Sequence, residues 1–325
     1  MKALLRTILP CIVLLLLNMP AFCWGFFGHQ RINYYAVFLL PPEMMVLYKK
    51  NIRFLSEHAV DPDKRRYAVK EEGPRHFIDI DVYGKYPYPD LPRRYDSAVA
   101  RFGETKVQEN GIVPWHVQTM LYRLTEAFKA KDFSRIMKNS AELGHYIADA
   151  HVPLHASSNH NGQLTNQKGI HAFWESRVPE LLAEKNFDFF IGKAEYIKDP
   201  GGFIWDRVLE SAAAADTVLQ LEKTLTEQFS EDKKYSFEER NGIVVRQYSS
   251  AFTKAYNEQL NGMVERRMRQ SIFAIASFWY TAWVNAGQPD LKGLVKQKFS
   301  EKDVKEFEEL NIKWNNGGTI IGREE

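Results

Sequence analysis

The sequence predicts an all-α protein built as one large helical unit. Long segments repeat apolar residues at the helical period and are rich in good helix formers. Strands do not alternate regularly with helices, so a parallel α/β sheet is not expected. Prolines, glycines and asparagines fall between the segments, as expected for turns. The longest predicted helical segments are residues 116–131, 133–150, 203–229 and 249–286.

Residues 1–23 have the pattern of an export signal. A short positive start precedes an apolar run, and the segment ends at Cys23 with a small-x-small pattern suited to cleavage. The run is too short to favour a membrane span. The alternative is a lipid attached to Cys23, but the bulky Phe22 stands where lipidation needs a small residue. We therefore predict a periplasmic or secreted mature chain that begins at Trp24.

Residues 24–287 form the predicted helical unit, and 271–286 is its most apolar stretch. This stretch of 16 residues is short for a bilayer, and serine, threonine and asparagine interrupt it. We interpret it as a buried core helix and expect no transmembrane segment in the mature chain. The sequence then becomes strongly charged, so residues 288–325 are predicted to form a peripheral helix and a loose tail.

The charge balance neither predicts nor excludes a nucleic-acid partner. The chain has 43 basic and 41 acidic residues, and the signal contains two of the bases and none of the acids. The mature chain is therefore formally neutral, whereas nucleic-acid binding usually leaves a basic excess. Both cysteines lie in the signal. The mature chain thus has no disulfide, and core packing or bound metal must stabilise it.

The central motif has the order His-x-x-x-Asp-x-x-x-Pro-x-His and contains His145, Asp149 and His155. Helical residues four apart project from one face, so His145 and Asp149 can hold one metal ion. The second oxygen of Asp149 is then free to bridge to another ion. Pro153 ends the helix and lets His155 approach the same region from the following loop.

A second pair with the same spacing follows at His171 and Glu175. Two such pairs separated by one loop suggest a cluster built from adjacent helices. Imidazole and carboxylate donors without thiolate fit zinc in a catalytic rather than a closed structural site. Upstream, His76 stands beside an apolar, strand-prone patch, and Asp61 and Asp63 precede it.

The predicted mature N-terminus contributes Trp24 and His29. A free α-amino group and the carbonyl oxygen of the same residue can chelate zinc in a five-membered ring. This chelate requires cleavage directly before Trp24. Four histidines fall outside these patterns and are assigned no metal role: His58, His116, His151 and His160.

With these motifs in this order, the sequence resembles the zinc-dependent phospholipase C family and the related S-one/P-one-type single-strand nucleases. The resemblance covers residues 24 to about 180 by motif and implies a multi-helix fold around a trinuclear zinc centre. It implies that the first zinc binds Asp61, His76, His145 and Asp149, and the second binds His155, His171 and Glu175. The third would take the amino and carbonyl groups of Trp24, His29 and the far oxygen of Asp149. Asp63 is the alternative to Asp61.

The resemblance further implies a phosphodiester hydrolase that uses metal-activated hydroxide. Asp149 would act through its bridging role, and Asp61 could also serve as a base on the water. Glu175 as the last ligand and the neutral mature charge favour a phospholipase-C-like enzyme. The close spacing of Trp24 and His29 resembles the nucleases, which makes a single-strand nuclease the first alternative. A non-catalytic zinc-binding module is the second, and the full ligand set argues against it.

Substrate selection is expected to come from the rim of the metal centre. A phospholipase would use apolar rim residues to receive a diacylglycerol leaving group, whereas a nuclease would stack a base on an aromatic ring. We therefore expect a phospholipid or another small phosphodiester, with single-stranded nucleic acid as the alternative, and no stable protein partner. The predicted rim consists of Phe26, Phe27, the loop 159–169 and Trp174.

Overall fold

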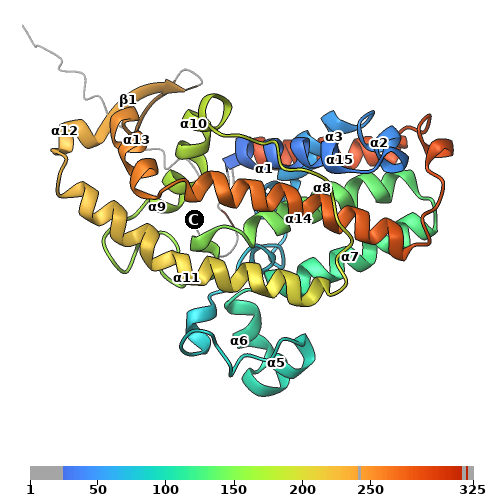
Figure 1. The fold of residues 1–325 in the computed structure, drawn as a ribbon, viewed down its shortest axis with the longest axis horizontal. Coiled ribbons are helices and arrows are strands. Elements are labelled where there is room, and N and C mark those ends of the chain that lie inside the picture. Colours follow the sequence, from blue (N-terminus) through green and yellow to red (C-terminus); the bar gives the residue numbers. More distant parts are fainter. Residues whose placement is uncertain (1–24, 241–242, 317–319, 321–325) are drawn as a thin grey trace, which may run out of the picture.

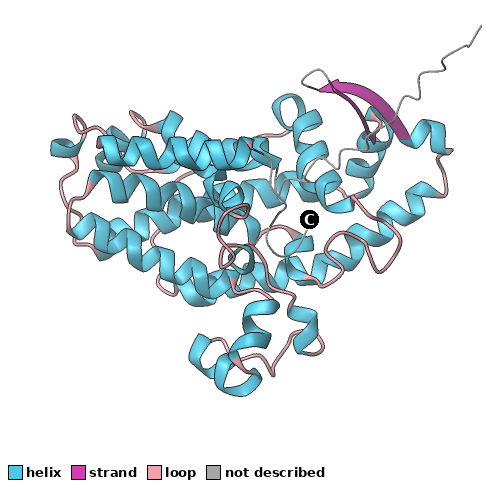
Figure 2. Cartoon of the chain, turned by 180° about the vertical axis from the view of Figure 1, so that it is seen from behind, coloured by secondary structure: helices cyan, strands magenta, loops and turns pink. Residues whose placement is uncertain are grey.

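The computed structural model describes residues 25–240, 243–316 and 320, and this part of the chain is helical apart from one hairpin. The all-α prediction is confirmed. Figure 1 shows the two longest helices, α11 (Pro200–Thr226) and α14 (Met263–Asn285), running along the length of the molecule. The view from behind in Figure 2 shows the hairpin projecting at one end, and the short helices α5 and α6 projecting at one side.

The remaining helices of the described chain lie around this pair or at its ends. The N-terminal half contains α1 (Gly25–Ala36), α2 (Pro42–Tyr48), α3 (Ile52–Glu57), α4 (Asp61–Arg65), α5 (Tyr95–Phe102), α6 (Glu104–Glu109), α7 (Val113–Lys129) and α8 (Phe133–Asp149). The C-terminal half adds α9 (Ile170–Ala172), a π-helical turn (Phe173–Arg177), α10 (Val178–Asn186), α12 (Glu231–Lys234), α13 (Ser250–Gln259) and α15 (Glu301–Asn315).

Helix α8 forms the centre of the core. Its first turn is capped by Asp132, whose carboxylate accepts a hydrogen bond from the backbone N–H of Arg135 at 3.1 Å. In the middle of the helix, Ser140 binds two neighbours: its carbonyl accepts from Trp279 Nε1 at 2.9 Å, and its hydroxyl lies 2.8 Å from the hydroxyl of Tyr48. Because these polar groups are buried and paired, they fix how α14 and α2 pack against α8.

Helix α1 lies against α8 at a close approach that Gly144 permits. A Cβ atom at Gly144 would lie 2.1 Å from the side-chain oxygen of Asn33. The amide of Asn33 is itself fixed, since it donates to the carbonyls of Leu55 and Ala141, both at 3.0 Å. The absence of a side chain at Gly144 therefore sets the distance between the two helices, directly beside His145.

Residues 271–285 of the apolar stretch form the second half of α14 and are mostly buried, as predicted, although Asn285 at the end is exposed. Within the described residues, no helix has both the length and the hydrophobicity to cross a bilayer. The predicted segment 249–286 is two helices, α13 and α14, rather than one. The chain turns between them at Asn261 and Gly262, which have φ values of 49° and 72°. This left-handed conformation cannot continue a helix, and glycine adopts it readily.

Two further local predictions differ from the structure. The strand-prone patch after His76 has no regular secondary structure at residues 77–79 and then forms a 3₁₀ turn (Ile80–Tyr83). Its backbone bonds to separate loops instead of a strand: Ile78 N–H donates to the carbonyl of His155 at 2.9 Å, and Asp79 N–H donates to that of Asn110 at 2.7 Å. The hairpin was not predicted. It pairs β1 (Tyr235–Arg240) with β2 (Ile243–Tyr248) in an antiparallel register that places Tyr235 opposite Tyr248. The predicted peripheral helix after residue 288 is present as α15.

Candidate metal centre

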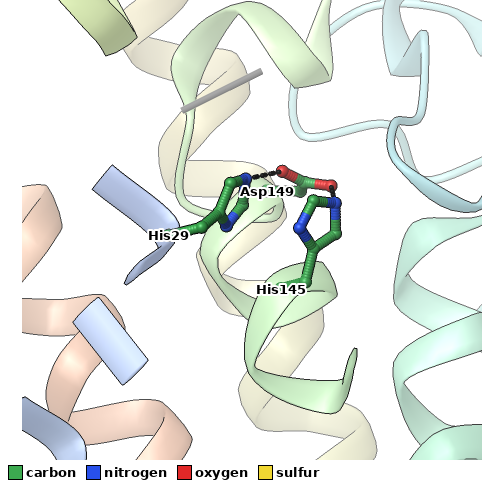
Figure 3. A group of neighbouring side chains, drawn as sticks. All are labelled: His29, His145 and Asp149. Atoms are coloured by element: carbon green, nitrogen blue, oxygen red, sulfur yellow. Dashed lines mark ion pairs between the residues drawn. The ribbon is translucent and has the colours of Figure 1, made fainter. Parts of the chain in front are cut away.

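The last turn of α8 presents His145 and Asp149 on its buried face, as their spacing predicted. Both side chains are fully buried. The two oxygens of Asp149 point in different directions: Oδ2 lies 3.2 Å from Nε2 of His145, and Oδ1 lies 3.4 Å from Nε2 of His29 on α1. Figure 3 shows these two histidines approaching the carboxylate from separate sides. Asp149 therefore has the arrangement of a carboxylate that can bridge two metal ions.

The Oδ2 side of Asp149 faces a first group of candidate ligands. His76 Nδ1 lies 3.0 Å from Asp149 Oδ2 and 2.9 Å from His145 Nε2. Asp63 Oδ1 lies 3.7 Å from His76 Nδ1 and 3.6 Å from His145 Nε2. Donor atoms from α4, α8 and the loop before Phe77 thus converge on one point.

The aspartate in this group is Asp63, whereas we had predicted Asp61. Asp61 is directed to the outer side of α4, where its carboxylate lies 2.6 Å from His58 Nδ1 and 3.2 Å from Lys64 Nζ. The physical reason is the turn of α4: two residues along a helix differ by about 200° in direction, so only one of the two aspartates can face inward.

A second group of candidate ligands contains His155, His171 and Glu175. His171 Nε2 lies 3.1 Å from Glu175 Oε2 and 3.2 Å from His155 Nε2, and the distance from His155 Nε2 to Glu175 Oε2 is 3.5 Å. Pro153 begins the 3₁₀ turn η5 (Pro153–Ala156), which returns His155 toward the site as expected. His171 and Glu175 come from α9 and the π-helical turn that follows it.

The ring orientation of the histidines is set by backbone carbonyls. Nδ1 of His145 lies 2.8 Å from the carbonyl oxygen of Ala59, Nδ1 of His155 2.6 Å from that of His76, and Nδ1 of His171 3.1 Å from that of His160. A carbonyl oxygen only accepts hydrogen bonds, so Nδ1 must carry the proton in each ring. Each Nε2 then presents a lone pair, which is the form that binds a metal ion.

The polar atoms of the centre fit metal ions better than they fit one another. Within the described residues, both nitrogens of His29 and both carboxylate oxygens of Asp63 are buried without a hydrogen-bond partner. Two unprotonated Nε2 atoms also face each other at 3.2 Å in the second group. Buried polar atoms are rarely left unpaired, and such an excess of acceptors calls for a cation. Imidazole-rich groups select transition ions over Ca²⁺ or Mg²⁺.

Electrostatics support the same conclusion. Burial opposes ionisation of Asp149, but His145 and His155 outweigh it and hold its pKa well below the usual range. Burial alone would lower the pKa of His145. The negative carboxylates of Asp149 and Asp63 have the larger combined effect and raise this pKa to about 9. For His29, burial and the neighbouring His145 lower the pKa. Without metal, protonated His145 therefore supplies positive charge that an ion would otherwise bring.

Glu72 supports the centre from behind His76, and the sequence motifs did not single it out. Its buried carboxylate lies 3.5 Å from His76 Nε2 and accepts hydrogen bonds from Arg65 Nε at 3.0 Å, Arg75 Nη1 at 2.8 Å and the hydroxyl of Tyr146. This contact directs Nδ1 of His76 toward the ligand group. Glu72 precedes His76 by four residues, the same spacing as the two predicted pairs, so its signal was present.

The start of α1 is held beside the second group. The backbone N–H of Gly25 donates to Ser176 Oγ at 3.1 Å, and Ser176 follows Glu175. A Cβ atom at Gly25 would lie 2.5 Å from the same oxygen. Trp24, the predicted terminal ligand, lies outside the described residues.

The other histidines occupy structural positions. His151 is buried with Nδ1 2.7 Å from the carbonyl of Ile147, and His116 packs edge-on against Tyr146. His58 pairs with Asp61, as described above. His160 lines a recess of about 480 Å³ beside the ligands, together with Phe77, Asp79, Glu109, Asn161, Gln163 and Lys168.

The predicted aromatic rim is mostly packed away. Trp174 is fully buried, Phe27 packs against the core, and the ring of Phe26 lies 5.2 Å from that of Trp314. Trp174 was predicted to line the rim of the site, but it is a core residue instead. The predicted loop 159–169 does border the recess.

Comparison with known proteins identifies no relative. The sequence matches no known family model, and a search of characterised proteins gives no match.

Proposed function

We propose that this protein is a zinc-dependent phosphodiester hydrolase of the phospholipase C type. The observation that carries the proposal is the carboxylate of Asp149, which faces His76 and His145 with one oxygen and His29 with the other. A single structural ion needs no such shared carboxylate. The second group, His155, His171 and Glu175, adds a further set of three buried donors.

The spacing of the donors supports zinc as the ion. Zinc bonds of 2.0–2.1 Å in a tetrahedron place neighbouring donor atoms about 3.3 Å apart. The donor pairs in the second group are separated by 3.1, 3.2 and 3.5 Å. In the first group, the distances between the donor atoms of Asp63, His76 and His145 range from 2.9 to 3.7 Å. The amino and carbonyl groups of Trp24 would complete the ligands around His29.

Bound zinc would supply two things that phosphodiester hydrolysis needs, a hydroxide at neutral pH and neutralisation of charge on the phosphoryl oxygens. The role of the chain is to hold these donors rigidly and to keep His145, His155 and His171 in the Nδ1-protonated form. Asp63 and Asp149 supply the negative charge that retains the cations. Asp61, which we had considered as a base, lies on the outer side of α4 with His58 and Lys64 and is a poor candidate for that role.

The recess beside the ligands bears on the substrate. Its lining combines Lys168, His160 and two amides with the carboxylates of Asp79 and Glu109, and the Nδ1 of His171 lies 3.1 Å from the carbonyl of His160 at its edge. A recess with this lining suits a polar substrate group more than an acyl chain. This observation keeps a single-strand nuclease as the second candidate, although the burial of Trp174 removes the aromatic residue most suited to stacking a base.

The first experiment measures nitrophenol release from bis(p-nitrophenyl) phosphate by the mature protein, with and without zinc. The His171→Ala variant is the inactive comparison, and Asp61→Ala is the matched variant outside the ligand groups. We expect zinc-dependent hydrolysis that His171→Ala abolishes and Asp61→Ala retains. A protein that holds zinc but releases no nitrophenol would instead be a non-catalytic zinc module.

The second experiment identifies the substrate. The same preparation is tested on phosphatidylcholine micelles and on single-stranded DNA. Release of diacylglycerol without DNA cleavage is the outcome we expect. Rapid cleavage of DNA with no diacylglycerol released would place the protein with the nucleases.

A further inference from the structure

Helix α15 lies on the surface of the molecule, after the helical unit predicted to carry the site. It begins with a capping box in which Ser300 and Asp303 bond reciprocally, so its start is well defined. None of its fifteen residues is buried. Figure 1 shows it running behind α1 and α3. A helix this exposed contributes little to the core, so its contacts indicate what else it does.

One end of α15 contacts α1 close to a candidate ligand. The ring of Trp314 lies 5.2 Å from the ring of Phe26. Phe26 precedes His29 by three residues, which places the two side chains about one helical turn apart. The position of Trp314 therefore bears on how the first turn of α1, and with it His29, is held.

Helix α15 also contacts α4, next to the candidate ligand Asp63. Lys64 follows Asp63, and its side chain is only 10% exposed. Its Nζ donates to Asn311 Oδ1 at 2.8 Å and lies 5.9 Å from the centre of the Trp314 ring. Because α4 is a single short helix, holding Lys64 outward keeps Asp63 directed inward.

A third contact joins α15 to α8. Lys138 Nζ donates to Asp303 Oδ1 at 2.6 Å and to Glu306 Oε2 at 2.9 Å. Between these contacts, Phe307 packs near Phe54, with 5.4 Å between ring centres, and near His58 at 4.4 Å. The helix thus contacts each of the three helices that carry His29, Asp63, His145 and Asp149.

The second ligand group is supported mainly from elsewhere. Its residues lie on η5, α9 and the π-helical turn, which pack chiefly against α11 and α10 and, through Gly25 and Ser176, also touch the start of α1. Phe173 of the π-helical turn also stacks on Tyr248 of the hairpin at 3.8 Å. The two halves of the metal centre therefore have different main supports.

We propose that α15 is a positioning element for one half of the metal centre: by holding α1, α4 and α8 together, it sets the zinc affinity of the His29, Asp63, His145 and Asp149 cluster, and it affects the His155, His171 and Glu175 group much less. The inference rests on the metal binding proposed above and not on the reaction. Trp314 and Phe307 are the residues that dock the helix.

The test compares two double variants of the full mature chain. Phe307→Ala with Trp314→Ala removes the docking residues, whereas Val304→Ala with Ile312→Ala truncates side chains of the same helix that are 44% and 57% exposed. Zinc per chain is measured after dialysis against a zinc buffer. We expect the docking variant to bind zinc at the first cluster about 10-fold more weakly or worse, the size of effect typical of residues that support ligands. The exposed pair should match wild type.

The second group provides an internal reference. The docking variant should retain about one ion, and adding His171→Ala should remove it. A docking variant that retains as many ions as wild type would overturn the proposal. Absence of phosphodiesterase activity in wild-type protein that holds its full zinc would instead contradict the proposed function and leave the role of α15 intact.

A measurement on the wild-type chain covers the case in which the docking variant fails to fold. If docking of α15 favours zinc binding, zinc must favour docking of α15 to the same degree. Zinc should therefore slow amide hydrogen exchange in α15 relative to the chelated protein, with α5 and α6, which carry no ligands, as the reference. Equal exchange of α15 in the two states would refute the inference.

Discussion

Replacement of Gly144 by alanine tests whether the approach of α1 to α8 sets up the metal centre. The added Cβ would lie 2.1 Å from Asn33 Oδ1 and 2.9 Å from its Nδ2. Asn33 cannot move aside at a low cost in free energy, because its amide is buried and donates hydrogen bonds to the carbonyls of Leu55 and Ala141. The collision must therefore move α1, which carries His29, away from Asp149.

The magnitude follows from three opposing effects. Overpacking a core costs about 1–3 kcal/mol. Disturbing the two hydrogen bonds of Asn33 costs about 0.5–1.5 kcal/mol each. Alanine recovers about 1 kcal/mol through its higher helix propensity. The free energy of unfolding should therefore fall by about 1–5 kcal/mol, and the ion next to His29 should be lost.

Urea unfolding of the zinc-free protein measures the stability, and elemental analysis measures the metal content. Gly201→Ala in α11 is the matched control, because its Cβ would meet the flexible end of Gln118 at 3.1 Å and Asp199 Oδ1 at an ordinary contact distance of 3.5 Å. That variant should keep its zinc and change little in stability. A Gly144→Ala protein as stable as wild type, with full zinc content, would show that the close approach has no bearing on the site.

Three further predictions address the ligands and their support. Asp63→Ala should lower zinc content and activity while Asp61→Ala keeps both nearly intact, and elemental analysis showing the reverse order would restore Asp61 as the ligand. Glu72→Gln removes the carboxylate that contacts His76 and pairs with the partly buried Arg65 and Arg75, so it should weaken zinc binding about 10- to 100-fold in a competition titration with a chelator; unchanged affinity would remove Glu72 from the support of the centre. In the zinc-free protein the pKa of His145 is raised to about 9, above its ordinary value. This group stabilises the fold fully below about pH 6.5 and loses that contribution, at most about 3 kcal/mol, as the pH rises through 9. Urea unfolding between pH 6 and 9 should show the loss in chelated but not zinc-saturated protein.

Much of the fold could be predicted because helical periodicity is a local property. The four predicted segments correspond to α7, α8, α11 and the pair α13 and α14, with ends that differ by a few residues. The hairpin was missed because its strands, Tyr235–Arg240 and Ile243–Tyr248, carry many charged residues and lack a clean alternation. Its stability comes from contacts that sequence does not display, such as Arg177, which donates to the carbonyl of Tyr248 and to Glu238.

The candidate ligands could be predicted where two of them lie on one helix. The pairs at His145 and at His171 come together in the structure as their spacing required. The choice between Asp61 and Asp63 depended on how the five-residue helix α4 is rotated about its axis. The neighbouring elements determine that rotation, so the local sequence does not predict it. The burial of Trp174 likewise depends on the packing of the whole unit, so its apolar character alone could not distinguish a core position from a rim.

The hydrogen bond from His155 Nδ1 to the carbonyl of His76 has a consequence for how the centre fills. His76 supplies its ring to the first ligand group and its backbone to the second, so the two groups share one residue. An ion that fixes the ring of His76 also fixes the carbonyl that orients His155, and the reverse holds equally. Zinc at one group should therefore favour zinc at the other, and a titration should be steeper than independent sites would give.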